Sequence, residues 1–221
     1  MDLKISGGLF DFDGVVADSM PAHLGAWSEA YRELFNKAPD KSVIDKQVGR
    51  SGKVIAQYLA NHAQKPYDYQ RLFARKCQLT IENVDAVALL RGTRDMWQSL
   101  MRENIPFGIV SNAPRDFIKA VLQRNGLDVE FFLAIEDYNC PKPHPEPYLK
   151  GFQKLLLKNR NLRVSEVAVF EDSFHGIKAA TGAGMPCFGI TSLYSREELK
   201  TAGALNSFND LGQAAKLLFP Q

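Results

Sequence analysis

The chain has 221 residues, of which 45% are hydrophobic, and its formal net charge is +2. A chain of this size can bury a full hydrophobic core, and its scattered charges exclude a strong bulk attraction to nucleic acid or to a membrane surface. No apolar run approaches the ~20 residues that span a bilayer, the N-terminus is too short and polar for a secretory signal, and the three cysteines have neither disulfide-framework nor zinc-site spacing, so we expect a cytoplasmic protein.

The first predicted element is a buried strand in SGGLFDFD, residues 6–13, which ends near Asp13. Its apolar residues do not alternate cleanly with polar ones, which is typical of a strand buried on both faces of a parallel sheet. Asp11 and Asp13 lie at its end, two residues apart, and Gly14 follows as a turn residue. Residues i and i+2 of a strand point the same way, so the spacing predicts that the two carboxylates face the same side.

The region from residue 20 to residue 87 has a different pattern. It contains helical stretches, such as AHLGAWSEAYRELF (22–35) and GKVIAQYLANHAQ (52–64), and no convincing strand. We interpret it as an all-helical domain inserted just after the first strand.

From residue 88 onward, predicted strands alternate with predicted helices. Strand-like runs are PFGIVSNA, EVAVFEDS and PCFGIT, and helical runs are TRDMWQSLMREN, PRDFIKAVLQRNG and SFHGIKAATGAG. This alternation predicts an α/β fold built on a parallel sheet.

Polar side chains gather at the carboxyl ends of three predicted strands, where open α/β sheets bind ligands. They are Asp11 and Asp13 after the first strand, Ser111 and Asn112 after PFGIV, and Glu171 and Asp172 after EVAVF. Carboxylates that converge on one edge repel each other, so we predict a hard divalent cation with oxygen ligands, and Mg²⁺ fits. Lys142, in the proline-stiffened loop CPKPHPEPYL, and a serine hydroxyl beside such a cation suit a phosphate group.

Four motifs occur in one order between residues 9 and 185. They are DFDGVVADS, a D-x-D-G motif; VSNA, an apolar strand ending in serine; Lys142 before Pro143; and VFEDSFHGIKAATGAGM, acidic residues before a glycine-rich helix. In this combination the chain resembles phosphotransferases of the haloacid dehalogenase superfamily, and most of all the β-phosphoglucomutase-like branch with its sugar-phosphatase relatives. The resemblance implies a Rossmann-like core of residues 1–19 and 88–221 with a helical cap domain of residues 20–87.

The resemblance also implies a role for each residue of the core motifs. Asp11 would be the nucleophile that forms an aspartyl-phosphate, and Asp13 the general acid and then the base that activates water. Ser111 would donate to the phosphoryl oxygens, and Lys142 would help to keep Asp11 ionised. The implied Mg²⁺ ligands are Asp11, Asp13 through its backbone carbonyl, Asp172, and Glu171 either directly or through water. Without the resemblance, such carboxylates are often turn formers and such a serine a helix cap.

The substrate contacts are expected from the cap and from the second motif. The branch carries a His and a Trp four residues apart near its active site, although such a Trp is usually core and such a His a satisfied surface group. The run VGRSGKVI, residues 48–55, lacks the first glycine and the final Ser or Thr of a P-loop, so we interpret it as a cap loop that contacts a non-transferring group. The predicted contacts are His23, Trp27, Arg50, Ser51, Lys53, Asn112 and Arg115.

We predict Mg²⁺-dependent hydrolysis of a small phosphate monoester, most plausibly a sugar phosphate, by a monomer or weak homo-oligomer that binds neither nucleic acid nor membrane. The alternative enzyme is a phosphosugar mutase of the β-phosphoglucomutase type. The mutase pattern places an arginine shortly after the loop serine, whereas Gly52 and Lys53 follow Ser51, which favours hydrolysis. A non-catalytic phosphate-binding module would lack the nucleophile or the general acid, and both Asp11 and Asp13 are present.

Overall fold

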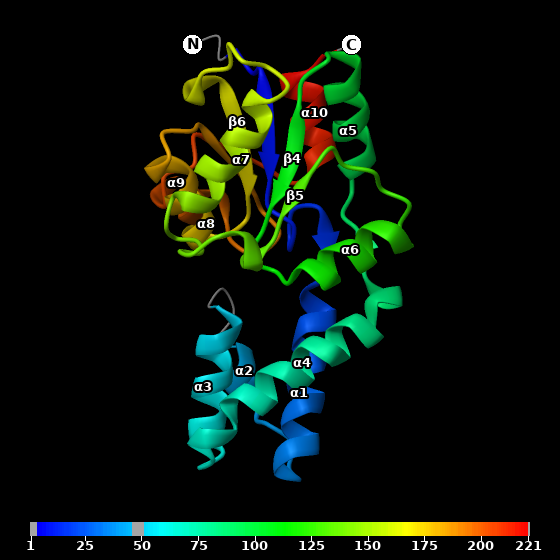
Figure 1. The fold of residues 1–221 in the computed structure, drawn as a ribbon, viewed down its shortest axis with the longest axis vertical. Coiled ribbons are helices and arrows are strands. Elements are labelled where there is room, and N and C mark those ends of the chain that lie inside the picture. The colour runs from blue at the N-terminus through cyan, green and yellow to red at the C-terminus, as the bar shows by residue number, and fades with distance from the viewer. Residues whose placement is uncertain (1–3, 46–50, 221) are drawn as a thin grey trace.

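The computed structural model describes residues 4–45 and 51–220 (Figure 1). The strands are β1 (Gly7–Phe10), β2 (Ala17–Asp18), β3 (Ala88–Leu89), β4 (Phe107–Val110), β5 (Phe132–Leu133), β6 (Val167–Glu171), β7 (Cys187–Ile190) and β8 (Asn206–Phe208). The α-helices are α1 (Met20–Phe35), α2 (Lys41–Asp45), α3 (Gly52–His62), α4 (Tyr69–Glu82), α5 (Thr93–Arg102), α6 (Arg115–Arg124), α7 (Glu146–Leu156), α8 (Phe174–Gly182), α9 (Arg196–Thr201) and α10 (Leu211–Leu218). Single 3-10 turns cover Pro66–Asp68, Val84–Ala86, Ile135–Asp137 and Val164–Glu166.

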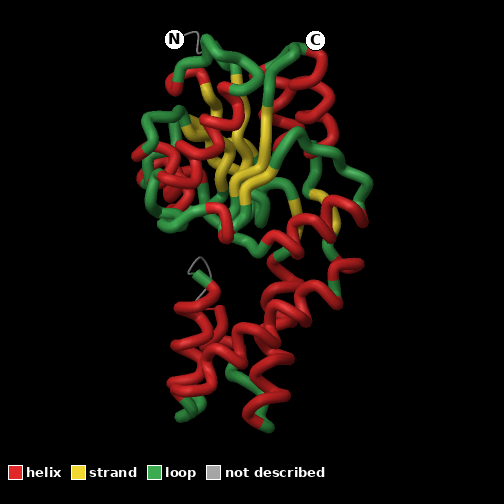
Figure 2. Tube along the Cα trace, viewed as in Figure 1, coloured by secondary structure: helices red, strands yellow, loops and turns green. Residues whose placement is uncertain are grey.

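The main sheet has six parallel strands in the order β5-β4-β1-β6-β7-β8. Successive side chains of β1 point to opposite faces: Leu9 packs into the core covered by α7, α8 and α9, and Phe10 into the core covered by α5, α6 and α10. Figure 2 shows the yellow strands between these two sets of red helices. The sheet therefore buries both faces, which explains the continuous apolar runs and confirms the predicted α/β class.

Helices α1 to α4 pack on one another at one end of the molecule, away from the termini (Figure 1). They have a hydrophobic core of their own, which includes Trp27, Tyr31, Leu59 and Leu72. The chain enters this helical region after β2 and returns to the sheet through β3, and these two strands pair antiparallel with Ala17 opposite Leu89. Both connections between the two parts of the molecule therefore run side by side.

Two features of the sheet were not predicted from the sequence. Strands β5 and β8 have two and three residues, which is too short for a recognisable hydrophobic pattern.

Within residues 20–45 and 51–87 the structure contains helices and turns but no strand. Over the described part of the chain, no helix has both the length and the hydrophobicity to cross a membrane.

Candidate active site

The chain turns earlier after the first strand than the sequence analysis predicts. Strand β1 ends at Phe10, and the carbonyl oxygen of Phe12 accepts a 2.9 Å hydrogen bond from the Ala17 N–H, which closes a tight turn. Asp13 therefore lies in this turn, and strand alternation does not set its orientation relative to Asp11. The Phe12 side chain between the two aspartates is fully buried in the core.

Three carboxylates converge where β1 and β6 end. One oxygen from each of Asp11, Glu171 and Asp172 lies within 4.8 Å of the others, and all three residues are buried. Gly14 permits this packing, because a Cβ atom there would lie 1.9 Å from Asp172 Oδ2. We call these three residues the acidic cluster.

Lys142 supplies a positive charge to the acidic cluster. Its Nζ donates to Asp11 Oδ1 at 2.9 Å, to Glu171 Oε1 at 2.6 Å and to the carbonyl oxygen of Val110 at 2.8 Å. Burial alone would lower the pKa of this lysine, but the charges of Asp11 and Glu171 outweigh it and raise the pKa. Lys142 therefore stays an ammonium group in contact with the predicted nucleophile.

One ammonium does not compensate three buried carboxylates. Burial, followed by the charge of Glu171, raises the pKa of Asp11 from 3.8 to about 7 despite the opposing effect of Lys142. Burial and the charges of Asp11 and Glu171 also raise the pKa of Asp172 well above its ordinary value. The cluster thus lacks about as much positive charge as a divalent cation carries.

The two acidic residues at the end of β6 have different surroundings. Glu171 Oε1 accepts from Lys142 and from the Tyr148 hydroxyl at 2.6 Å, and Oε2 accepts from the Ser173 hydroxyl at 3.1 Å. Asp172 accepts from the Ser192 hydroxyl at 3.0 Å, and no lysine or arginine in the described ranges pairs with it. The all-oxygen cluster therefore fits a hard cation, with Asp172 and Asp11 better placed than Glu171 as direct ligands.

Asp13 faces the helical region rather than the acidic cluster. Its Oδ1 accepts hydrogen bonds from the Ser19 hydroxyl and from His23 Nε2, the latter at 3.2 Å. His23 Nδ1 in turn lies 2.9 Å from Nζ of Lys76, which is buried on α4. His23 was predicted from the sequence but Lys76 was not, because the only signal of Lys76 is a cation on the apolar face of an amphipathic helix.

These contacts shift the pKa values along this chain of side chains. Burial would raise the pKa of Asp13, but the charge and hydrogen bond of His23, with the Ser19 hydrogen bond, outweigh it and lower the pKa. Burial lowers the pKa of Lys76, against the smaller opposing effects of Cys77 and Asp13. Asp13 is therefore an ionised carboxylate. Lys76, which His23 connects to it, releases its proton more readily than an exposed lysine does.

The three residues that were predicted to contact the substrate after β4 have different surroundings. Ser111 is buried, and its Oγ accepts from the Ala113 N–H at 3.0 Å, which leaves its hydroxyl hydrogen available to a ligand. The Asn112 side chain makes two hydrogen bonds to the backbone of Lys142, at 3.2 and 3.3 Å, and so positions the loop that carries the lysine. Arg115 pairs with Asp137, in the turn that follows β5.

The predicted cap contacts also lie in different places. Trp27 is 3% exposed and packs inside the helical region, with the Lys76 Nζ 5.5 Å from the centre of its ring. Ser51 and Lys53 are exposed where α3 begins, and Arg50 lies outside the described residues.

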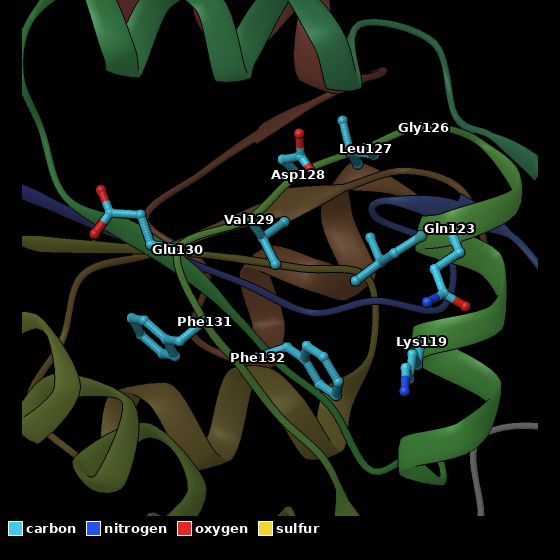
Figure 3. A pocket seen from close by; sticks show the side chains of 10 residues that line it. Lys119, Gln123, Gly126, Leu127, Asp128, Val129, Glu130, Phe131 and Phe132 are labelled. Carbon is cyan, nitrogen blue, oxygen red and sulfur yellow. The ribbon is translucent and has the colours of Figure 1, made fainter.

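A pocket of about 520 Å³ lies elsewhere, between α6 and the segment that leads into β5 (Figure 3). Lys119 and Gln123 line one side and Val129 to Phe132 the other, and none of its residues belongs to the acidic cluster. We therefore base the candidate active site on the converging side chains and not on this pocket.

Comparison with known proteins agrees with this arrangement. Residues 9–190 match the family model described as haloacid dehalogenase-like hydrolase. The chain is 30% identical to validoxylamine A 7'-phosphate phosphatase of Streptomyces hygroscopicus subsp. limoneus, over 89% of this chain and 91% of that protein. It is 29% identical to glycerol-1-phosphate phosphohydrolase 2 of Saccharomyces cerevisiae, over 92% and 81% of the two chains.

The fold is shared with solved structures of the same kind. A haloacid dehalogenase hydrolase of family IA, variant 3, from Entamoeba histolytica superposes with a TM-score of 0.83 at 22% identity, over 98% of this chain and 100% of that chain. The sequence match covers most of the chain and includes the acidic cluster and Lys142. The protein belongs to the haloacid dehalogenase-like hydrolase family.

Proposed function

We propose that the protein is a phosphatase that hydrolyses a small phosphate monoester, a sugar phosphate, through a covalent aspartyl-phosphate on Asp11. The observation that carries the proposal is the buried Asp11 carboxylate at the end of β1, 2.9 Å from the Lys142 ammonium. The names of the two relatives, a phosphatase and a phosphohydrolase, support the same reaction.

Two steps account for the reaction. In the first, an Asp11 oxygen attacks phosphorus, the bond from phosphorus to the substrate oxygen breaks, and Asp13 gives a proton to that oxygen. In the second, Asp13 takes a proton from water, the water oxygen bonds to phosphorus, and the Asp11 carboxylate leaves. Ser111 donates its hydroxyl to a phosphoryl oxygen, and Lys142 stabilises the negative charge beside Asp11.

Asp13 must change protonation state between these steps. Its pKa is below the ordinary value without substrate, so the carboxylate is ready to act as a base. A phosphate dianion placed beside it raises its pKa, because two negative charges disfavour each other. The bound substrate thus promotes the protonated form that the first step requires.

We propose that Mg²⁺ occupies the acidic cluster, held by Asp11 and Asp172, with the Asp13 backbone carbonyl as a further ligand and Glu171 acting through water. The unbalanced charge of three buried carboxylates and one lysine supports this assignment. When bound, the ion supplies positive charge to the phosphoryl oxygens.

We propose that residues 20–87 act as a cap that closes over the substrate and excludes bulk water. The exposed side chains of Ser51 and Lys53 at the start of α3 are then available to the part of the substrate that is not transferred. His23 is held against Asp13 and acts on the general acid–base.

The test is a panel of phosphate monoesters incubated with the protein and Mg²⁺ and followed by phosphorus NMR. The panel includes glycerol 1-phosphate, several hexose and hexitol phosphates, and β-glucose 1-phosphate with a trace of the bisphosphate. We expect inorganic phosphate to be released, faster from sugar and polyol phosphates than from an aryl phosphate, and the Asp11→Asn variant to release none. Glucose 6-phosphate that accumulates faster than inorganic phosphate would show a mutase instead.

A further inference from the structure

A second group of metal-ligating side chains lies outside the acidic cluster, on the loop that precedes α7. One ligand atom from each of Cys140, His144 and Glu146 lies within 4.8 Å of the others. Cys140 and His144 are exposed, and Glu146 is partly exposed, so an ion can reach them from solvent. The spacing of the three cysteines does not reveal this group, because it contains a single cysteine.

The backbone holds the three side chains together before any ion binds. The loop has prolines at positions 141, 143 and 145, and the His144 N–H donates to the Pro141 carbonyl at 3.0 Å, which folds the loop back on itself. The Glu146 carboxylate accepts from the backbone N–H groups of Asn139 and Cys140 at 3.1 and 2.9 Å. Little ordering is therefore left to be done when a ligand binds.

We propose that Cys140, His144 and Glu146 form a binding site for Zn²⁺ or a metal ion of similar softness. Thiolate, imidazole and carboxylate are the ligand types that zinc takes in proteins, and three of them leave one position for water. Mg²⁺ prefers oxygen ligands, so the acidic cluster and this site select different metals. The proposal does not depend on the reaction proposed for Asp11.

Ion binding is accompanied by simple proton and charge changes. The thiol of Cys140 loses its proton to solvent when its sulfur binds the ion. The His144 Nδ1 atom accepts a 3.2 Å hydrogen bond from the Glu146 N–H, and an ion bound to this nitrogen replaces that hydrogen bond. Lys150, Asn139 and Cys140 together hold the pKa of Glu146 down at about 2, so its carboxylate is ionised.

Lys150 competes with a metal ion for the Glu146 carboxylate. Its removal should therefore strengthen metal binding, whereas removal of a ligand should weaken it. The Lys150 Nζ lies 2.8 Å from Glu146 Oε1, so a bound cation must share that carboxylate with an ammonium group. Removing the ammonium group should tighten metal binding, because the backbone N–H groups still hold Glu146 in place. A surface thiol that binds zinc nonspecifically would not respond in this way.

The site also flanks the catalytic lysine. Cys140 and His144 lie two residues on either side of Lys142, whose backbone is anchored by Asn112. An ion that joins Cys140 to His144 therefore closes the loop around Lys142 on its solvent side.

The experiment is a Zn²⁺ titration of the full chain by calorimetry, with Mg²⁺ in excess, and a parallel Co²⁺ titration that monitors the sulfur-to-cobalt absorption. We expect one zinc per chain and a cobalt–sulfur band. Cys140→Ser should abolish the band, and His144→Ala should weaken zinc binding at least about tenfold, since removing even an outer partner of a metal ligand costs that much. Lys150→Ala should tighten binding.

Three matched variants keep the result specific. Cys77→Ser and His62→Ala remove residues of the same types elsewhere, and Asp172→Asn removes a carboxylate of the acidic cluster; none should change the cobalt band. The proposal is overturned if the wild type shows no band, if the band survives in Cys140→Ser, or if His144→Ala binds zinc as the wild type does. Circular dichroism checks that each variant is folded.

Discussion

Lys142 and Lys76 are both buried, but they lie in different regions and have different neighbours. Lys142 reaches into the edge of the sheet, where its ammonium group contacts Asp11 and Glu171. Lys76 projects from α4, and its ammonium nitrogen contacts the His23 imidazole. Burial lowers the pKa of a lysine, and it prevails at Lys76, whereas the two carboxylates reverse it at Lys142.

The opposite pKa shifts of Lys142 and Lys76 indicate that the two lysines have different roles in the site. At the sheet edge the charge of Lys142 is fixed, which suits a position beside Asp11, the proposed nucleophile. On the helical side, the Lys76 Nζ lies 2.9 Å from the His23 imidazole, and His23 contacts Asp13, the proposed general acid–base. We infer that the core supplies permanent electrostatics and the helical region supplies adjustable protonation.

The largest effect is expected at the sheet edge, from Asp11→Asn. An amide cannot form the covalent intermediate, so kcat should fall by about four orders of magnitude or more. Steady-state turnover of the best substrate from the panel measures this, with circular dichroism as the check on folding. A folded variant that binds Mg²⁺ and keeps near-normal kcat would contradict the assignment of the nucleophile.

The next effect distinguishes the two acidic residues that follow β6. Asp172→Ala should weaken Mg²⁺ binding by roughly a hundredfold, because a direct ligand is lost. Glu171→Ala should weaken it less but lower the free energy of unfolding by about 1–3 kcal/mol, since the buried Tyr148 hydroxyl loses its acceptor while Lys142 keeps Asp11.

Calorimetric Mg²⁺ titration and urea unfolding of both variants measure the two quantities. Removal of the metal by a chelator should abolish turnover in the wild type, and added Mg²⁺ should restore it. The opposite ranking in metal affinity would mean that Glu171 is the direct ligand.

A smaller effect is expected on the helical side, from Lys76→Met. Its ammonium group helps to hold the pKa of Asp13 low, so the pKa of Asp13 should rise in the variant. We expect kcat to fall about tenfold. As the pH is lowered, the dephosphorylation rate of the variant should begin to fall at a higher pH than that of the wild type. His23→Asn should move this acid limb further, because His23 contacts Asp13 directly. Rapid-quench measurements between pH 5 and pH 8 test both shifts, and identical profiles for wild type and variants would remove the helical side from the acid–base chemistry.

The smallest effect is on stability without metal. Because the folded-state pKa of Asp11 is raised to about 7, the folded protein binds more protons than the unfolded chain between about pH 4 and pH 7. Stability from this group is therefore present at low pH and is lost as the pH rises through 7.

In a chelator, Asp11→Asn should consequently melt at a higher temperature than the wild type at pH 7.5 and at about the same temperature at pH 4.5. Asp116→Asn, at an exposed position, is the matched control and should not move the melting temperature at either pH. A wild type that gains stability from pH 4.5 to pH 7.5 relative to Asp11→Asn would reverse the sign and refute the raised pKa.

The contrast between the sheet edge and the helical region also explains which site residues could be predicted from the sequence. Asp11, Glu171 and Asp172 follow recognisable buried strands, and the carboxyl ends of parallel strands meet at one edge, so their convergence followed from local patterns. The contact between His23 and Lys76 joins residues 53 positions apart on two packed helices, and no local pattern encodes it. The ion pair between Arg115 and Asp137 likewise joins residues 22 positions apart on different elements.

The β2–β3 ribbon has a consequence for how this protein can be taken apart. Asp18 and Ala88 are directly opposed on two paired strands, so the chain leaves for the helices and returns at neighbouring points. Removing everything between them leaves two ends that a two-residue Asn-Gly hairpin turn can join without moving the sheet. We infer that the helical region can be exchanged as a module, because both of its connections to the sheet lie on the β2–β3 ribbon.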